Sequence, residues 1–233
     1  MSSPPPRHDV LGYPLDAVTF SGAADWGLRE VAEARRSGPS SRLVVTLNPE
    51  IVVQAAASPQ LAAALRAADL SVADGVGVAW AARRSGTPLP GRVPGVDLAF
   101  EVMRRGGSDL RVYLLGAKPG VAERAAAEAA SRFGVNVVGS HHGYFDRSAP
   151  DEVLRAVASS RADLLLAGLG EGQELFLHSH AAQLGVGVMV GVGGTLDVLA
   201  GEVKRMPAWT RRLGVEWLFR VALDRRRWDR LPR

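Results

Sequence analysis

Apolar runs of strand length recur between residues 42 and 193, and alanine-rich stretches with helical spacing of their apolar positions separate them. Nearly continuous apolar runs are typical of strands that are buried on both faces of a parallel sheet. The predicted strands are RLVVTLN (42–48), DLSVAD (69–74), RVYLLGA (111–117), VNVVGS (135–140), ADLLLAG (162–168) and GVGVMVGVG (185–193). The alternation predicts the α/β class, with a mostly parallel sheet flanked by helices.

The intervening segments predict helices, for example over residues 59–68, 121–133 and 151–160, and residues 13–38 predict one short strand followed by one helix. The pattern changes near residue 202. Trp209, Leu213, Trp217 and Val221 are spaced four apart, as the apolar stripe of an amphipathic helix requires. We therefore expect an α/β body over residues 1–201 and a C-terminal helical appendage over residues 202–233.

The predicted body and the predicted appendage also differ in net charge. Residues 202–233 hold ten Lys and Arg against four Asp and Glu, whereas the whole chain carries a net charge of only +4. Arginine interleaved with tryptophan suits anionic lipid headgroups or phosphates, and a solvated helical face over core tryptophans is the alternative. The chain has no cysteine, its start lacks the apolar segment of a signal peptide, and no apolar run reaches the length of a membrane span. These features predict a cytoplasmic protein that does not cross the membrane.

The predicted strands end in small, polar and glycine-rich sequences. These ends are TLN (46–48), DG (74–75), GAK (116–118), GLG (168–170) and GVGG (191–194). Ligands of open α/β sheets bind beyond the carboxyl ends of the strands, and glycine lets backbone N–H groups approach a phosphate. Several such ends on one edge predict a phosphorylated or nucleotide ligand. No Walker loop is present, and no G-x-G-x-x-G follows the first predicted strand, which disfavours a nicotinamide-dependent oxidoreductase.

Asp74 is an acidic residue at the end of a buried strand. One interpretation is a general base that takes a proton from a substrate hydroxyl, and the other is a cap for a helix that begins near Val76. Metal ligands are scarce, because there is no D-x-D pair and because His178 and His180 are too close in sequence to share a helix face. The adjacent pair His141 and His142 is more typical of local hydrogen bonding, so we expect no metal or other cofactor.

In order along the chain, TLNPEIV (46–52), ADGVGV (73–78), RVPGVDL (92–98), GAKPGV (116–121), GYF (143–145), GLGEGQE (168–174), GVGGTLDVLAGEVKRMPAW (191–209) and GVEWLFR (214–220) resemble the WecG/TagA/CpsF glycosyltransferases. The resemblance implies a Rossmann-like body and an appendage that brings it to the inner face of the cytoplasmic membrane. It further implies transfer of N-acetylmannosamine, its uronic acid or a hexose from a UDP-sugar to a polyprenyl-diphosphate-linked sugar. Such enzymes serve bacterial cell-surface polysaccharide and teichoic-acid-type biosynthesis.

The resemblance also implies roles for single residues. Asp74 matches the general base of an inverting reaction, and Arg92 matches an arginine that meets phosphate charge. The other positions that match donor-binding residues are Thr46, Asn48, Gly116, Gly168, Gly170, Gln173, Glu174, Gly193, Gly194 and Asp197. The candidates for the acceptor diphosphate and the membrane are Arg205, Arg211, Arg212, Arg220 and Arg227. No nucleic-acid partner is expected, and self-association into a homo-oligomer stays open.

One motif departs from the family pattern. GLGEGQE is one residue shorter than the usual GxGxPKQE, lacks its Pro-Lys pair and places Glu171 in the loop. An acidic residue beside a diphosphate is repulsive unless a cation compensates. The alternative hypothesis is therefore a catalytically altered member that binds nucleotide sugars or acts as a scaffold in polysaccharide assembly.

Overall fold

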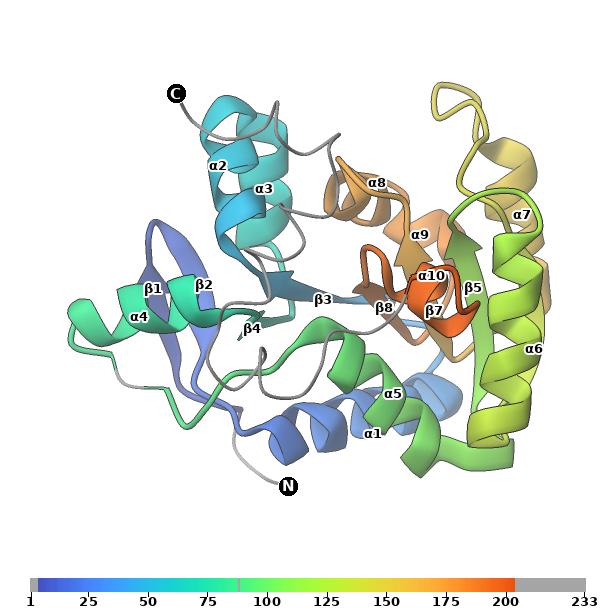
Figure 1. The fold of residues 1–233 in the computed structure, drawn as a ribbon, viewed down its shortest axis with the longest axis horizontal. Helices are drawn as coiled ribbons and strands as arrows, with labels where there is room; N and C mark the ends of the chain where they lie inside the picture. Colours follow the sequence, from blue (N-terminus) through green and yellow to red (C-terminus); the bar gives the residue numbers. More distant parts are fainter. Residues whose placement is uncertain (1–3, 88, 204–233) are drawn as a thin grey trace. The chain divides into compact units, whose positions relative to one another are not determined.

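A computed structural model describes residues 4–87 and 89–203, so the predicted appendage lies almost entirely outside the described residues. A six-stranded sheet forms the centre of the body, in the order β4-β3-β8-β7-β5-β6, and every neighbouring pair is parallel (Figure 1). Its strands are β3 (Arg42–Leu47), β4 (Leu70–Ala73), β5 (Arg111–Gly116), β6 (Asn136–His141), β7 (Leu164–Gly168) and β8 (Val188–Gly191). Five strands fall within predicted apolar runs and β6 extends one residue beyond its run, to His141, so the predicted fold class is confirmed for the body.

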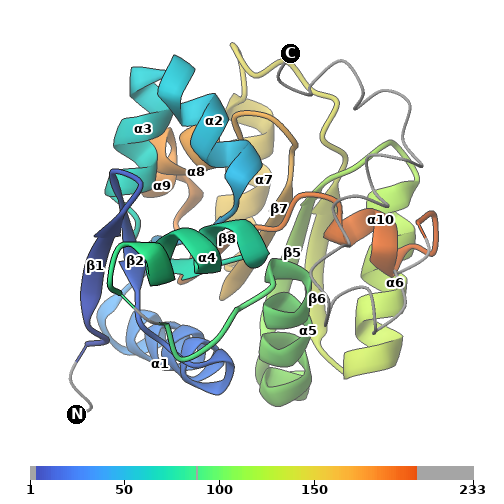
Figure 2. The same cartoon turned by 60° about the vertical axis from the view of Figure 1, so that its left-hand side comes forward.

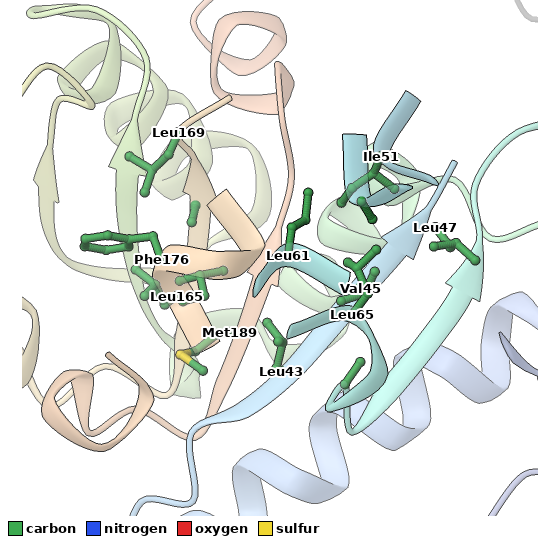
Figure 3. Packing of buried hydrophobic residues seen from close by; sticks show 14 of the residues in the cluster. Leu43, Val45, Leu47, Ile51, Leu61, Leu65, Leu165, Leu169, Phe176 and Met189 are labelled. Carbon is green, nitrogen blue, oxygen red and sulfur yellow. The ribbon is translucent and has the colours of Figure 1, made fainter. Parts of the chain in front are cut away.

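Two apolar layers cover the sheet, because alternate residues of each strand point to opposite faces. On one face, Leu43, Val45 and Leu47 of β3 pack with α2 (Pro49–Ala57) and α3 (Pro59–Arg66) (Figure 3). The same layer includes α4 (Val76–Arg84), α7 (Asp151–Ser160), α8 (Gln173–Ser179) and α9 (Ala181–Leu184). The opposite layer comprises α1 (Phe20–Ser37), α5 (Gly95–Gly106), α6 (Val121–Phe133) and α10 (Thr195–Leu199), and a short 3₁₀ helix (Gly107–Asp109) follows α5.

The N-terminal segment corrects one prediction. Instead of a single strand before α1, residues 7–16 form an antiparallel hairpin of β1 (Arg7–Val10) and β2 (Tyr13–Asp16). Leu11 and Gly12 supply the two positive φ values that a tight hairpin turn needs. Asp16 accepts two hydrogen bonds from Arg7 at 2.8 Å and one from Ser71 N–H at 2.7 Å. These bonds fix the hairpin to β4, a long-range effect that the local pattern does not contain.

The chain leaves the four central strands, β3, β8, β7 and β5, toward alternate faces of the sheet. After β3 and β7 it enters α2 and α8 in one layer, whereas after β8 and β5 it enters α10 and α6 in the other. Figure 2 shows α2 and α8 on one side of β8, and α6 and α10 on the other. Loops that separate in this way leave space beyond the carboxyl ends of the strands, where α/β proteins bind their ligands.

Candidate active site

Asp74 follows β4 at the carboxyl edge of the sheet and is half-buried. Its N–H donates to the carbonyl of Leu47 at 2.8 Å, which extends the pairing of β3 and β4 by one residue. Its Oδ2 accepts a hydrogen bond from Gly95 N–H, the first residue of α5, at 3.1 Å. The helix that begins at Val76 has Gly75 as its N-cap and no side-chain cap bond. Gly75, and not Asp74, is therefore the N-cap residue of that helix, and the Asp74 carboxylate accepts a hydrogen bond from the start of α5.

The segment before α5 runs beside the end of β4. Val93 N–H donates to the carbonyl of Ala73 at 2.9 Å, so the segment with Arg92 and Val93 lies beside the segment with Ala73 and Asp74. Arg92 is half-buried there. The structure thus brings the predicted base and the predicted phosphate-binding arginine to the same place, although 18 residues separate them in the sequence.

Thr46 and Asn48, at the end of β3, lie next to this pair. Thr46 is only 7% exposed, and its Oγ1 donates to the carbonyl of Gly191 at 3.4 Å. A Cβ placed on Gly95 would lie 3.0 Å from the Thr46 side chain, so Thr46 and the start of α5 are in close contact. Asn48 is the N-cap of α2, with its Oδ1 accepting from Ile51 N–H at 3.1 Å. The side chain of Asn48 therefore fixes the exit of β3, and Thr46 joins β3 to the end of β8.

The predicted glycines of three neighbouring strand ends pack against one another. A Cβ on Gly116, the last residue of β5, would overlap the carbonyl of Gly168, and a Cβ on Gly168 would lie 2.6 Å from the carbonyl of Gly193. Ala117 N–H also donates to the Gly168 carbonyl at 3.1 Å. Gly170 has a φ of +72°, which favours glycine, and Gly194 is exposed. Gly116, Gly168 and Gly193 therefore form a floor of closely packed backbone, which we call the glycine floor.

Gln173 and Glu174 lie beneath the loop that follows β8. Glu174 is 4% exposed, and its Oε1 accepts from Gln173 Nε2 at 2.6 Å. Gln173 Oε1 accepts from Gly193 N–H at 3.3 Å, and a Cβ on Gly191 would lie 2.6 Å from Glu174 Oε1. Burial raises the pKa of Glu174 to about 7, while the bonds from Gln173 and from its own backbone act in the opposite direction. The two side chains thus support the β8 loop from below.

Asp197 lies in the first turn of α10, half-buried above the same edge. Burial raises its pKa, the negative charge of Glu202 raises it further, and the positive charge of Lys118 partly opposes both. Lys118 follows β5 and Asp197 follows β8, so a cation and a carboxylate from strand ends on either side of β7 interact here.

Two residues with structural effects at this edge were missed by sequence reasoning. Gly95 orients Asp74, and its only sequence signal is a glycine directly after a proline. Arg147, in the loop before α7, donates to the carbonyl of Glu171 at 2.8 Å and to that of Leu169. Arg147 places a cation against the loop that lacks the expected lysine, and no local pattern predicts this contact.

The structure tests the remaining predictions only in part. Arg205, Arg211, Arg212, Arg220 and Arg227 lie outside the described residues. Within residues 4–87 and 89–203, no group of three or more His, Asp or Glu side chains is arranged to hold a metal ion. In the same part of the chain, no helix combines the length and the apolar character that a membrane span requires.

Comparison with known proteins gives a coherent result. A family model described as "Glycosyl transferase WecG/TagA/CpsF family" matches residues 8–233. A protein of Staphylococcus aureus strain NCTC 8325 / PS 47, named N-acetylglucosaminyldiphosphoundecaprenol N-acetyl-beta-D-mannosaminyltransferase, is 36% identical over 231 residues. The match covers 97% of this chain and 87% of that relative. Proteins with the same name from strains COL and MSSA476 match to the same extent.

Proposed function

Since the chain belongs to the WecG/TagA/CpsF family and is a glycosyltransferase, we propose that it moves one sugar from a UDP-sugar to a sugar on a polyprenyl diphosphate. The name of the S. aureus relatives, an N-acetylmannosaminyltransferase acting on N-acetylglucosaminyldiphosphoundecaprenol, makes this donor sugar and this acceptor the first to test. The observation that carries the proposal is the half-buried Asp74 carboxylate, oriented by Gly95 at the carboxyl edge of a parallel sheet.

Asp74 acts as the general base. Its carboxylate accepts the proton of the acceptor hydroxyl, and the hydroxyl oxygen forms a bond to the anomeric carbon of the donor sugar. The oxygen attacks from the face opposite the diphosphate, the bond from that carbon to the diphosphate oxygen breaks, and UDP leaves with the electron pair. The anomeric configuration inverts because attack and departure take place on opposite faces. General-base catalysis of this kind contributes about 10²- to 10⁴-fold in rate.

The donor diphosphate binds above the glycine floor. Exposed Gly194 and the left-handed Gly170 lie in the loops that border this floor, and backbone N–H groups in such loops suit phosphate oxygens. Arg92 contributes positive charge from the side of Asp74, with a planar guanidinium that matches phosphate geometry. Arg147 and Lys118 add cations at the loops after β7 and β5, which offsets the acidic Glu171.

Release of UDP tests the proposal directly. The purified full chain is given a panel of UDP-sugars and a synthetic N-acetylglucosamine-diphosphate-lipid in detergent, with Asp74→Asn and the exposed Asp151→Asn as matched variants. We expect acceptor-dependent UDP release by wild type and Asp151→Asn and its loss in Asp74→Asn. Binding of a UDP-sugar without turnover by any of the three would favour the nucleotide-sugar-binding alternative. We expect EDTA to leave the rate unchanged.

We further propose that the enzyme works at the inner face of the cytoplasmic membrane, with the basic residues 202–233 close to the acceptor diphosphate. The support is the excess of positive charge in that segment and the lipid-linked acceptor in the name of the relatives. Charge reversal of Arg211 and Arg212 should raise the KM for the lipid acceptor more than the KM for the UDP-sugar. An equal rise in both would count against an acceptor role.

A further inference from the structure

Helix α4 exposes a stripe of mixed apolar and cationic character. Val78, Ala81 and Ala82 are buried, whereas Trp80, Arg83 and Arg84 are exposed at positions i, i+3 and i+4. These three lie on one face of the helix. Trp80 is 66% exposed, although tryptophan is among the largest apolar side chains and is usually well covered. The structure of the body therefore leaves this face of α4 uncovered.

Helix α2 adds a second apolar stripe beside the first. Val53 is 68% exposed, and Pro49 and Ala57 are exposed at positions i−4 and i+4 from it. The two helices meet at their N-terminal ends, since a Cβ on Gly77 of α4 would lie only 2.7 Å from Pro49 Cγ. Figure 2 shows α2 and α4 as neighbours at the same end of the sheet. We call Pro49, Val53, Trp80, Arg83 and Arg84 the α2–α4 surface.

We propose that the α2–α4 surface docks on the headgroup region of an anionic lipid bilayer. An exposed tryptophan next to exposed arginines suits the boundary between lipid headgroups and acyl chains, where the ring is half-immersed and the guanidinium groups meet phosphate. Glu50 is the only acidic residue in α2 and α4, so the two arginines dominate the charge of these helices.

Charge favours an anionic bilayer over the C-terminal segment as the partner of the α2–α4 surface. Residues 202–233 hold ten Lys and Arg against four Asp and Glu, so they would bring positive charge onto Arg83 and Arg84. Like charges at close range repel, whereas an anionic bilayer attracts both the segment and the surface. Charge complementarity therefore favours an anionic bilayer as the occupant of this surface.

The position of the α2–α4 surface would orient the candidate active site toward the bilayer. Helix α4 begins two residues after Asp74, so docking of its exposed stripe brings the carboxyl edge of the sheet near the bilayer. If the proposed function holds, this orientation presents the base to an acceptor that is anchored in lipid. The inference about orientation rests on that function, but the docking itself does not.

Vesicle binding of the full chain tests the proposal. We compare partitioning onto vesicles of phosphatidylcholine with 30% phosphatidylglycerol, about a third anionic lipid, and onto pure phosphatidylcholine vesicles. The Arg83→Glu/Arg84→Glu variant should partition onto the anionic vesicles about tenfold or more weakly than wild type. The control variant Arg29→Glu/Arg155→Glu carries the same change of charge at exposed positions of α1 and α7, and it should differ much less. Equal losses in both variants would show a general charge effect and overturn the docking surface.

A fluorescent label gives a second readout that does not depend on charge. The chain has no cysteine, so Val53→Cys creates a single labelling site on α2, and Glu128→Cys on exposed α6 serves as the matched control. A polarity-sensitive dye at position 53 should shift to shorter wavelength on addition of anionic vesicles, and the dye at position 128 should not. Vesicle binding without a shift of the dye emission at position 53 would show that the protein binds lipid through another part. A shift that grows with protein concentration in the absence of lipid would show that a second copy of the chain covers the surface. Either result overturns the proposal.

The two proposals fail separately. Transfer to a short-chain acceptor in detergent should be unchanged in Arg83→Glu/Arg84→Glu, because that assay needs no bilayer. If the protein docks on vesicles but releases no UDP, the proposed function is wrong and the docking proposal stands. If sugar transfer is normal and the variant binds vesicles as well as wild type, the docking proposal is wrong and the proposed function stands.

Discussion

The buried carboxyl group of Glu174 predicts a stability that falls with pH. The ordinary pKa of 4.5 applies to the unfolded chain, and burial raises the pKa to about 7 in the folded protein. Between these two values the folded state keeps a proton that the unfolded state has released, so the free energy of unfolding decreases as pH rises. The contribution of Glu174 to the free energy of unfolding is highest below pH 4.5, where both states are protonated, and reaches its lower level above about pH 7.

The substitution Glu174→Gln removes this dependence. Each pH unit in which only the folded state holds the proton costs about 1.4 kcal/mol. The interval from 4.5 to about 7 therefore corresponds to about 3 kcal/mol. Glutamine keeps the oxygen that accepts from Gln173 Nε2 and resembles the neutral acid in shape. We expect the variant to match wild type near pH 4.5 and to be more stable by about 3 kcal/mol near pH 8.5.

Urea unfolding of both proteins at a series of pH values measures the difference. Subtracting one curve from the other cancels the groups that titrate alike in both. Glu128→Gln, at an exposed position of α6, controls for the loss of one negative charge. A difference between wild type and Glu174→Gln that stays constant from pH 4.5 to 8.5 would refute the reasoning, as would a variant that is less stable at pH 8.5.

Three further substitutions test the candidate site. Asp74→Asn should fold with wild-type stability within about 1 kcal/mol and lower kcat by about 10² or more, as measured by UDP release and urea unfolding. Gly95→Ala places a methyl group 3.0 Å from the Thr46 side chain, so it should shift the start of α5 and lower kcat about tenfold; a KM effect alone would contradict an orienting role for Gly95. Arg147→Met keeps an unbranched apolar stem but removes both hydrogen bonds to the 169–171 loop, so it should raise the KM for the UDP-sugar severalfold, whereas Arg155→Met on α7 should not.

Much of the fold follows from local pattern. The six strands of the main sheet are apolar runs because both faces of the sheet are covered, and that burial is visible in the sequence itself. The hairpin of residues 7–16 was missed because its stability depends on Asp16 contacting Ser71 across 55 residues. Local pattern carries no information about such a contact.

The sequence predicts residues of the candidate site but not the contacts that join them. Glycine-rich strand ends mark the edge, and the motifs identify Asp74 and Thr46 as members of it. The bond from Gly95 to Asp74, the bond from Gly193 to Gln173 and the contact of Arg147 with the loop after β7 each join segments about 20 residues apart. They depend on how the loops fold over the sheet, so residue spacing alone does not reveal them.

The glycine floor has a consequence for changing the sugar that the enzyme transfers. Its backbones are so close that no side chain larger than hydrogen fits at Gly116 or Gly168. For a donor that binds above the floor, as we propose, these two positions offer no side chain through which selectivity can be tuned. Discrimination between donors must then come from the rim, where residues such as Glu171 and Asp197 carry side chains at the same edge. A directed-evolution library for a new donor should therefore keep the floor fixed and vary the rim.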